Sequence, residues 1–270
     1  MAIALQDPIP WPSEAIWEAV YPTLPNFSVE VLAELDSSNT ELMRRARSGQ
    51  TDPVLLVAET QSAGRGRLGR EWVSTRGDSL TFSLGLPLPV KDWSGLSLAV
   101  GLSLAESLHP QVGLKWPNDL WIKGCKLGGI LIEAASTGSR SYVVIGVGLN
   151  INPQADAGLR TPPAALIDWL PDIDAAKALR LVAAPLLFAV QRFAQEGFAP
   201  LQSRFHARDV LCGLAVQTSD GVEGVSLGVD PTGALQIQTA SARVRILSSE
   251  VSVRPAELKE NKDIPEPKGN

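Results

Sequence analysis

Two hydrophobic periods alternate along the first half of the chain and predict a mixture of strands and helices. Short apolar or alternating runs of the strand type occupy residues 28–35, 54–60 and 79–86. Apolar residues at helical spacing occupy 96–108, and a short apolar stretch at 15–20, inside a proline-rich lead-in, predicts about one helical turn. Because strands and helices interleave, the pattern favours a mixed α and β fold.

A helix with clear start and stop signals is predicted between the first two strands. The polar cluster Asp36-Ser37-Ser38-Asn39 contains residues that cap helix N-termini. The segment TELMRRARS follows it, and Gly49 can end the helix. The cluster therefore lies at a strand-to-helix junction.

Residues 112–150 supply three further strand candidates, VGLKW, KLGGILIEA and YVVIGVGLN. The turn Thr137-Gly138-Ser139 joins the last two, and so short a connection makes them antiparallel neighbours. A helical region at 175–196 is expected to cover one face of the sheet. It is interrupted or restarted at Pro185 in this prediction, because proline breaks a helix interior.

From Gly213 the hydrophobic pattern changes to short alternating runs, separated by Asp-Gly and Asp-Pro-Thr-Gly turns. The runs are AVQTS, VEGVSLGV, ALQIQT and RVRILS. This pattern predicts a small β-barrel. The last residues are charged and poor in large apolar side chains, so they are predicted to be disordered. The expected organisation is a lead-in segment at 1–27, a main domain at 28–212, the barrel at 213–255 and a disordered tail at 256–270.

Composition narrows the class of protein. With 270 residues, of which 44% are hydrophobic, the chain can bury one large core and a small second unit. No secretory signal or membrane span is apparent, so a cytoplasmic location is expected. The formal charge of -5 argues against general affinity for nucleic acid. Cys125 and Cys212 are far apart and form no C-x-x-C pair, so neither zinc nor a disulfide framework is supported.

The segment from Gln61 to Trp72 carries the strongest chemical signal. Three arginines fall among three glycines directly after a strand: Arg65, Arg67, Arg70, Gly64, Gly66 and Gly69. Glycine allows close backbone approach to an anion, and the guanidinium fork matches phosphate or carboxylate oxygens. A solvated basic turn is the alternative. The glycines also fit G-x-G-x-x-G, but no helix follows and no kinase motif accompanies them, so dinucleotide and kinase sites are disfavoured.

A second polar segment, Lys115-Trp-Pro-Asn-Asp119, precedes the strand that begins Lys126-Leu-Gly-Gly. Pro117 stiffens its segment, which suits it to hold polar groups for a ligand. Lys126 can pair with a phosphate or carboxylate, and the two glycines leave room for that ligand. An ordinary edge-strand lysine beside a hairpin is the equally weighted alternative.

Two further clusters complete the candidate chemistry. Residues 144–152 place two glycines in a strand, where a flat ligand could lie, and Asn150 or Asn152 could reach a phosphate, a ribose or a metal's water shell; a β-bulge is the alternative. The cluster Ser37-Ser38-Asn39 offers hydroxyls and an amide to a polar head group, although helix capping explains one of them.

The motifs GRGRLGREW, KWPNDL, KLGGILIE and GVGLNIN, in this order and spacing, resemble those of biotin protein ligases. The resemblance covers roughly residues 30–255. It implies an α+β fold, with a mixed β-sheet catalytic domain of the biotin/lipoate ligase type packed with helices and a small C-terminal SH3-like β-barrel. The boundary near Gly213, reached from turn spacing, agrees. The lead-in is too short for a helix-turn-helix domain, so the monofunctional type without an N-terminal DNA-binding domain is expected.

The resemblance also implies roles for individual residues. Around biotin it implies Ser37, Ser38, Gln61, Gly64, Arg65, Lys126, Gly129 and Gly148. Along ATP it implies Arg67, Arg70, Trp72, Lys115, Asn118 and Asn150, with Trp72 packed on adenine. Lys126, Arg67 and Arg65 are the implied catalytic residues, and Asp119 is a further positioning group. Mg²⁺ accompanies ATP, with no metal ligand assigned to a side chain.

The implied activity is formation of biotinyl-AMP from biotin and ATP, followed by transfer of biotin to a lysine of a biotin carboxyl carrier protein domain. Residues 62–71 suit a lid over the intermediate. An antiparallel edge strand could pair two subunits into a homodimer, and neither nucleic acid nor a membrane is an expected partner. The competing hypotheses are a lipoate ligase or octanoyl transferase, a biotin-sensing transcriptional regulator, and a noncatalytic nucleotide-binding module.

Overall fold

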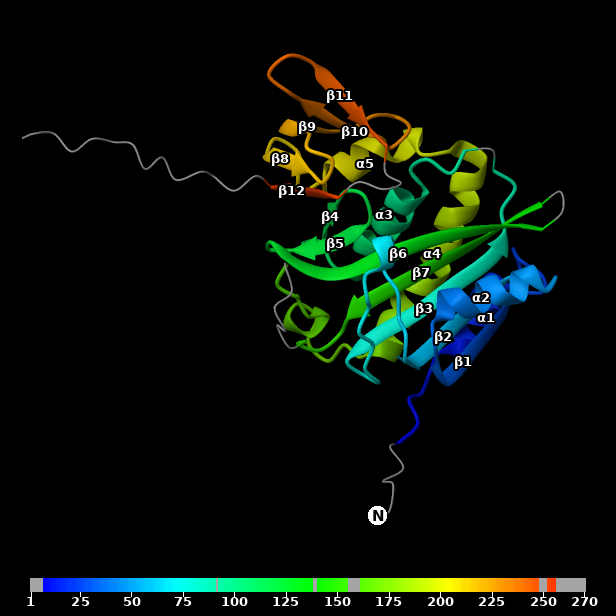
Figure 1. Cartoon of the computed structure of the whole chain (residues 1–270). Coiled ribbons are helices and arrows are strands. Elements are labelled where there is room, and N and C mark those ends of the chain that lie inside the picture. Colours follow the sequence, from blue (N-terminus) through cyan, green and yellow to red (C-terminus); the bar gives the residue numbers. More distant parts are fainter. Residues whose placement is uncertain (1–6, 91, 138–139, 155–160, 248–251, 256–270) are drawn as a thin grey trace, which may run out of the picture.

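A mixed sheet, described by the order β1-β2-β3-β7-β6-β5-β4, forms the centre of the molecule (Figure 1). The structure, a computed structural model, describes residues 7–90, 92–137, 140–154, 161–247 and 252–255. The strands of this sheet are β1 (Ser28–Leu35), β2 (Val54–Gln61), β3 (Ser79–Pro87), β4 (Gly113–Lys115), β5 (Asp119–Ile122), β6 (Cys125–Thr137) and β7 (Arg140–Asn150). β1 and β2 are parallel, and the other neighbours are antiparallel.

Helices cover both faces of this sheet. They are α1 (Ser13–Val20), α2 (Ser38–Arg47), α3 (Leu96–Leu108), α4 (Ala175–Glu196) and α5 (Gln202–His206), with short 3₁₀ turns at Arg67–Gly69, Leu166–Asp168 and Ala199–Leu201. α3 and α4 pack on each other and on one face, and α1 packs on α4 and β1. Of the described helices, α2 is the one on the opposite face, where it packs against β2, β3, β6 and β7 (Figure 1).

Strict alternation along β3 sorts its residues between these two faces. Leu80, Phe82 and Leu84 are fully buried and belong to the large core under α3 and α4. The intervening side chains of Thr81 and Ser83 are small and polar, and they point to the face of α2. Because α2 covers only part of that face, a sheet surface of small residues is left for a ligand.

The helix and strand predictions at 28–35, 54–60 and 96–108 are confirmed, as is the capped helix. Ser37 is the N-cap of α2, and its side chain accepts a hydrogen bond from the Thr40 N–H. Gly49 follows the helix with φ of 90°, the left-handed conformation that glycine adopts without strain.

Three predictions about local structure were wrong. The lead-in is not a single loose turn: α1 has eight residues and buries Ile16 and Val20. α4 runs through Pro185 without interruption, because that residue is on the exposed side and water can serve the carbonyl group it leaves unpaired. Asp119–Ile122, which was assigned no strand, is β5; the turn at Lys123 and Gly124, both with positive φ, joins it to β6.

The C-terminal unit is a five-stranded antiparallel sheet in the order β11-β10-β9-β8-β12, an open arrangement consistent with an SH3-like unit rather than a closed barrel. Its strands are β8 (Ala215–Thr218), β9 (Glu223–Val229), β10 (Leu235–Gln238), β11 (Arg243–Ile246) and β12 (Val253–Pro255). The segment of β12 was not predicted, because three residues beside a charged tail give no alternating pattern.

A turn of this small sheet holds it against the larger domain. Fully buried Trp116 donates its indole N–H to the Gly233 carbonyl oxygen at 3.1 Å. A Cβ on Gly233 would lie 2.7 Å from the Gly95 Cα atom, so the two backbones touch. The C-terminal sheet is thus packed directly behind the segment that carries Lys115 and Asn118.

Some predictions fall on residues outside the described ranges, namely the turn at 138–139 and the tail at 256–270. Both cysteines are free thiols. Among the described helices, none combines the length and apolar character needed to cross a bilayer.

Asp230 gives the docked turn a pH-dependent stability. Burial alone raises the pKa of Asp230, but hydrogen bonds from Thr232, Arg245 and the Ala234 N–H outweigh burial and lower the pKa to about 2. A carboxyl group whose pKa is lowered in the folded state stabilises the fold above its unfolded pKa and loses that contribution as pH falls.

Asp230→Ala should therefore lower the free energy of unfolding by roughly 2 kcal/mol near neutral pH. The difference from the wild type should shrink between about pH 4 and pH 2, where the native carboxylate is protonated. Urea unfolding across this range measures it, with Asp220→Ala in an exposed turn as the control. A deficit that stays constant down to pH 2 would contradict the role of charge.

Candidate ligand site

The candidate site lies on the part of the α2 face that the helix leaves open, beneath the glycine and arginine loop. That loop folds back as a narrow hairpin: the Trp72 N–H donates to the Gly64 oxygen at 2.9 Å, and the Gly66 N–H to the Arg70 oxygen at 2.7 Å. Leu68 and Gly69 at its tip both have positive φ, as a tight two-residue turn requires. The loop is thus a preformed hairpin above the sheet.

A β-bulge in β6 sets the direction of Lys126. Trp121 pairs with Lys126, whereas Leu120 pairs with Gly128, so Leu127 is an extra residue in the ladder. Leu127 is buried in the large core, and the Lys126 Nζ atom lies 3.5 Å from where a Cβ of Gly129 would stand. Without the bulge, residues 126 and 129 would face opposite sides of the sheet. The bulge therefore brings the lysine to the ligand face.

Asp119 pairs with the two lysines on this side of the site, Lys126 and Lys115. Its carboxylate lies 2.7 Å from the Lys126 Nζ atom and 3.8 Å from the Lys115 Nζ atom. Burial lowers the pKa of Lys115; Asp119 opposes this change, while Lys126 adds to it. One carboxylate serving two ammonium groups leaves a local excess of positive charge, which suits an anionic ligand.

Two loop arginines extend this positive region. Arg67 donates to the Asn118 Oδ1 atom at 3.0 Å, and the amide of Asn118 in turn donates to the Ile130 oxygen at 2.8 Å. Burial lowers the pKa of Arg67, although a guanidinium stays charged at any physiological pH. Arg70 donates to the Ser252 hydroxyl at 3.2 Å, which ties the hairpin to the C-terminal sheet.

Glycines of β7 form the floor of the site. A Cβ on Gly146 would lie 2.2 Å from the Asn39 Oδ1 atom, and a Cβ on Gly148 would lie 2.4 Å from the Trp72 Cε2 atom. A larger residue at either position would therefore clash with the Asn39 or Trp72 side chain that packs on it. The Trp72 indole N–H is buried and has no hydrogen-bond partner among the described residues.

The two asparagines at the end of β7 have different surroundings. The Asn150 amide donates to the Lys126 oxygen at 3.2 Å and to the Ala164 oxygen at 3.1 Å, so it offers its own oxygen to a ligand. The Asn152 amide donates to Asp78 instead, at 3.0 Å. Of the two alternatives raised by the sequence, the geometry favours Asn150.

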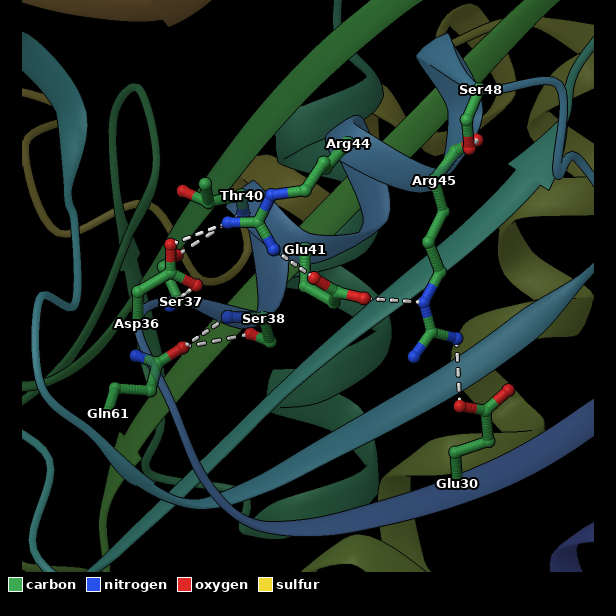
Figure 2. Close-up of polar contacts among 10 residues, drawn as sticks. All are labelled: Glu30, Asp36, Ser37, Ser38, Thr40, Glu41, Arg44, Arg45, Ser48 and Gln61. Atoms are coloured by element: carbon green, nitrogen blue, oxygen red, sulfur yellow. Dashed lines mark hydrogen bonds and ion pairs between the residues drawn. The ribbon is translucent and has the colours of Figure 1, made fainter.

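The polar cluster at the start of α2 meets Gln61 at the end of β2 (Figure 2). The Gln61 Oε1 atom accepts the Ser38 N–H at 2.7 Å and lies 3.0 Å from the Ser38 hydroxyl. Nearby, Arg44 bridges Asp36 and Glu41, and Arg45 bridges Glu41 and Glu30. The ion pairs of Arg44 are exposed and contribute little to stability, whereas those of Arg45 are partly buried.

The predicted residues thus converge in two groups. One surrounds the start of α2: Ser38 bonds Gln61, Gly64 lies against Gln61, and Arg65 reaches Asn39 through Glu133. The other surrounds Asp119, which pairs with Lys115 and Lys126, and Arg67 bonds Asn118 beside it. Trp72, which lies over Gly148, stands at the sheet floor beside them.

Sequence reasoning missed Ser83 and Glu133 as members of the site. Ser83 bonds into the α2 cluster, and Glu133 pairs with Arg65 at 3.1 Å. Their signal was the small polar residue at every second position of β3, and a carboxylate on the ligand face of β6, three positions beyond buried Ile130.

The arrangement can hold two anions side by side over an uncharged glycine floor. In the described part of the chain, no cluster of histidine, cysteine, aspartate and glutamate side chains could hold a metal ion by itself. Any divalent cation would therefore depend on ligand oxygens for most of its coordination.

Comparison with known proteins supplies the chemical context. The profile of the Biotin/lipoate A/B protein ligase family matches residues 32–150, and that of the Biotin protein ligase C terminal domain matches residues 214–254. The biotin–[acetyl-CoA-carboxylase] ligase of Mycobacterium tuberculosis is 34% identical over 83% of this chain and 88% of its own. The bifunctional ligase/repressor BirA of Escherichia coli is 33% identical over 85% and 75%.

A solved structure agrees with these sequences. The biotin protein ligase of Aquifex aeolicus, in complex with biotin and ATP, is 27% identical and superimposes with a TM-score of 0.74 over 86% of this chain and all of its own.

Gly148→Ala should displace the Trp72 indole, because a Cβ there would stand 2.4 Å from its ring and the partly buried side chain must yield. The free energy of unfolding should change by less than about 1 kcal/mol, since the indole can swing toward solvent. The Trp72 indole N–H signal, assigned by Trp72→Phe in a ¹H–¹⁵N spectrum, should shift. Gly66→Ala, with 3.6 Å of clearance, is the control; an unmoved indole in Gly148→Ala would disprove the contact.

Proposed function

The chain belongs to the biotin protein ligase family. From that premise we propose the roles of its residues in an ATP-dependent biotin–[biotin carboxyl-carrier protein] ligase. The enzyme forms biotinyl-5′-AMP and pyrophosphate from biotin and ATP, then transfers biotin to a lysine of a carboxylase carrier domain and releases AMP. The observation that carries the assignment of roles is the pair of adjoining groups, one around Ser38 and Gln61 and one around Asp119.

In the first step, a biotin carboxylate oxygen bonds to the α-phosphorus of ATP while the bond to pyrophosphate breaks. Negative charge builds on phosphoryl oxygens, and two anions must be held together meanwhile. We assign Lys126, with Arg65 and Arg67, to neutralise that charge. Arg70, Lys115, Asn118 and Asn150 hold the nucleotide, and Trp72 packs on its base.

The biotin end is assigned to the group around the start of α2. Ser37, Ser38 and Gln61 hold the polar ring of biotin, because they combine hydroxyl and amide groups in a largely buried place. Gly64, Gly129 and Gly148 leave the space that the ligand needs. The Ser37 oxygen already accepts the Thr40 N–H, so its hydroxyl proton is what it can offer.

In the second step, the neutral amine of the carrier lysine attacks the acyl carbon, and AMP leaves. The mixed anhydride is sensitive to water, so the hairpin at 62–71 is assigned the role of a lid. Its arginines contact both the catalytic sheet, through Asn118, and the C-terminal sheet, through Ser252.

Mg²⁺ is proposed to enter with ATP. It would neutralise phosphate charge, with its ligands supplied mainly by phosphate oxygens and water. The donor set fits this limited role, because Asn150 directs its amide oxygen away from the sheet backbone and Asp119 is the carboxylate beside the lysines.

The remaining assignments rest on the same chemistry. The substrates, ATP and a carboxylase, favour a cytoplasmic location, with no nucleic acid or membrane partner. The domain boundaries 28–212 and 213–255 are proposed as working limits of the catalytic and C-terminal units. A homodimer could form at a sheet edge, such as β1, which pairs with β2 alone.

Biotin-dependent ATP–pyrophosphate exchange tests the first step. Exchange should occur with biotin but not with lipoate, and Lys126→Ala should lower it by at least about 100-fold, because a charge that counters the transition state is removed. Lys177→Ala, an exposed lysine on α4, is the control. Exchange with lipoate alone would favour a lipoate ligase, and no exchange with either acid would favour a noncatalytic nucleotide-binding protein.

Arg67→Gly tests the lid. Removing its charge-assisted hydrogen bonds should accelerate release of biotinyl-AMP by about 10- to 100-fold, the effect of 1.5–3 kcal/mol on a rate. Bystander proteins should then become biotinylated on their lysines. Release of labelled adenylate measures this, with Arg192→Ala on α4 as the control; unchanged release kinetics would refute the lid assignment.

A further inference from the structure

Glu59, near the end of β2, joins the lead-in segment to the part of the chain that follows the glycine and arginine hairpin. One Glu59 oxygen accepts the Trp11 indole N–H at 2.8 Å, and the other accepts the Arg76 Nε–H at 2.7 Å. The Arg76 Nη2 group also donates to the Asp7 oxygen at 2.8 Å. One carboxylate therefore holds a residue of the lead-in and a residue beyond the hairpin at the same time.

Arg76 lies at the base of that hairpin. The two legs of the hairpin meet in an isolated backbone bridge between Gln61 and Ser74. Glu59 and Arg76 each lie two residues further from the tip, on these same legs. Side chains two residues apart along an extended chain point to the same face, so this ion pair is the next cross-strand contact after the bridge. The ion pair therefore closes the base of the hairpin.

The pair is partly shielded from water. The side chains of Glu59 and Arg76 are 12% and 25% exposed. Burial raises the pKa of Glu59, but hydrogen bonds from Arg76 and Trp11 outweigh burial and lower the pKa below its usual value. Loss of either donor would leave the carboxylate buried with fewer compensating hydrogen bonds, which weakens the contact that remains.

Trp11 has a fixed place because it belongs to the body of the domain. Its ring packs, partly buried, against the large core, and α1 begins two residues later at Ser13. Ile16 and Val20 of that helix are buried in the same core. Trp11 can therefore hold one Glu59 oxygen in place and so direct the other oxygen to Arg76.

Given the biotin ligase function proposed above, we propose that Trp11, Glu59 and Arg76 are positioning residues that keep the hairpin at 62–71 closed over the biotinyl-AMP intermediate. Arg76 fixes the returning leg of the hairpin, which carries Trp72 four residues earlier. The arginines near the tip contact Asn118 and Ser252, so the Glu59 cluster supplies an attachment at the opposite end. The lead-in segment thereby influences how long the intermediate stays bound.

Release of labelled biotinyl-AMP from the purified full chain, after a chase with unlabelled intermediate, tests this. Trp11→Phe keeps a ring against the core but removes the indole N–H. Release should become about 3- to 10-fold faster, as expected when one hydrogen bond contributes part of its strength to closure. Formation of the intermediate in a single turnover should stay within about twofold, because Lys126 and Asp119 are not altered. Trp93→Phe, another partly buried tryptophan packed against the large core, is the control.

A double-mutant cycle tests the route through Glu59. Arg76→Leu removes the contacts with Glu59 and Asp7, so it should accelerate release at least as much as Trp11→Phe does. Because Trp11 acts through the same contact, the combined variant should release the intermediate at most about twofold faster than Arg76→Leu alone. Arg76→Lys keeps a cation beside Glu59 and should lie between the wild type and Arg76→Leu.

The outcomes separate this inference from the function on which it rests. Formation and release at wild-type rates in Trp11→Phe would overturn the inference while leaving a biotin ligase intact. Effects of the two substitutions that multiply in the combined variant would also overturn it, as would a loss of folded protein in Trp11→Phe with unchanged release from the folded fraction. Absence of biotinyl-AMP formation by the wild type would instead contradict the proposed function.

Discussion

Successive side chains of each strand in the central sheet point to opposite faces, and the rest of the structure depends on this constraint. On one face, β3 and β7 supply large apolar side chains to the core under α3 and α4. On the other face, β7 packs Tyr142 and Val144 against α2, and beyond the helix it carries small residues, because Asn39 and Trp72 occupy the space above Gly146 and Gly148. Beyond the end of α2, the large core and the open surface thus take alternate residues of the same strands, and a change of register by one residue would exchange them.

The charged part of the site follows from one departure from that alternation. The bulge at Leu127 turns Lys126 toward Asp119, and Asp119 lies opposite Gly129 in the neighbouring strand. Two lysines share this carboxylate, so their mutual repulsion is only partly relieved in the protein alone. A bound anion would neutralise the remaining positive charge. A cluster of this kind contributes little to stability but suits the binding of phosphate and carboxylate groups.

Much of this organisation could be read from the sequence, for reasons that differ between segments. α3 was predictable because its apolar residues have helical spacing, and the start of α2 because Ser37 has the chemistry of a cap. The ligand segments were recognised because glycines and arginines together are difficult to explain by packing. Ser83 and Glu133 were missed, since alternation along a strand shows only which face such a residue occupies; the partners that bring them into the site are 44 to 94 residues away in the chain.

The open form of the C-terminal sheet and its place behind the site could not be predicted, because they depend on contacts between distant backbones. Yet they bear on what that sheet does. Trp116 donates to the Gly233 oxygen, while nearby Lys115 pairs with Asp119 and Asn118 accepts from Arg67. Arg70 of the loop donates to the Ser252 hydroxyl. The C-terminal part of the chain therefore contacts both the segment 115–118 and the hairpin 62–71, so it restrains the separation of these two parts of the site.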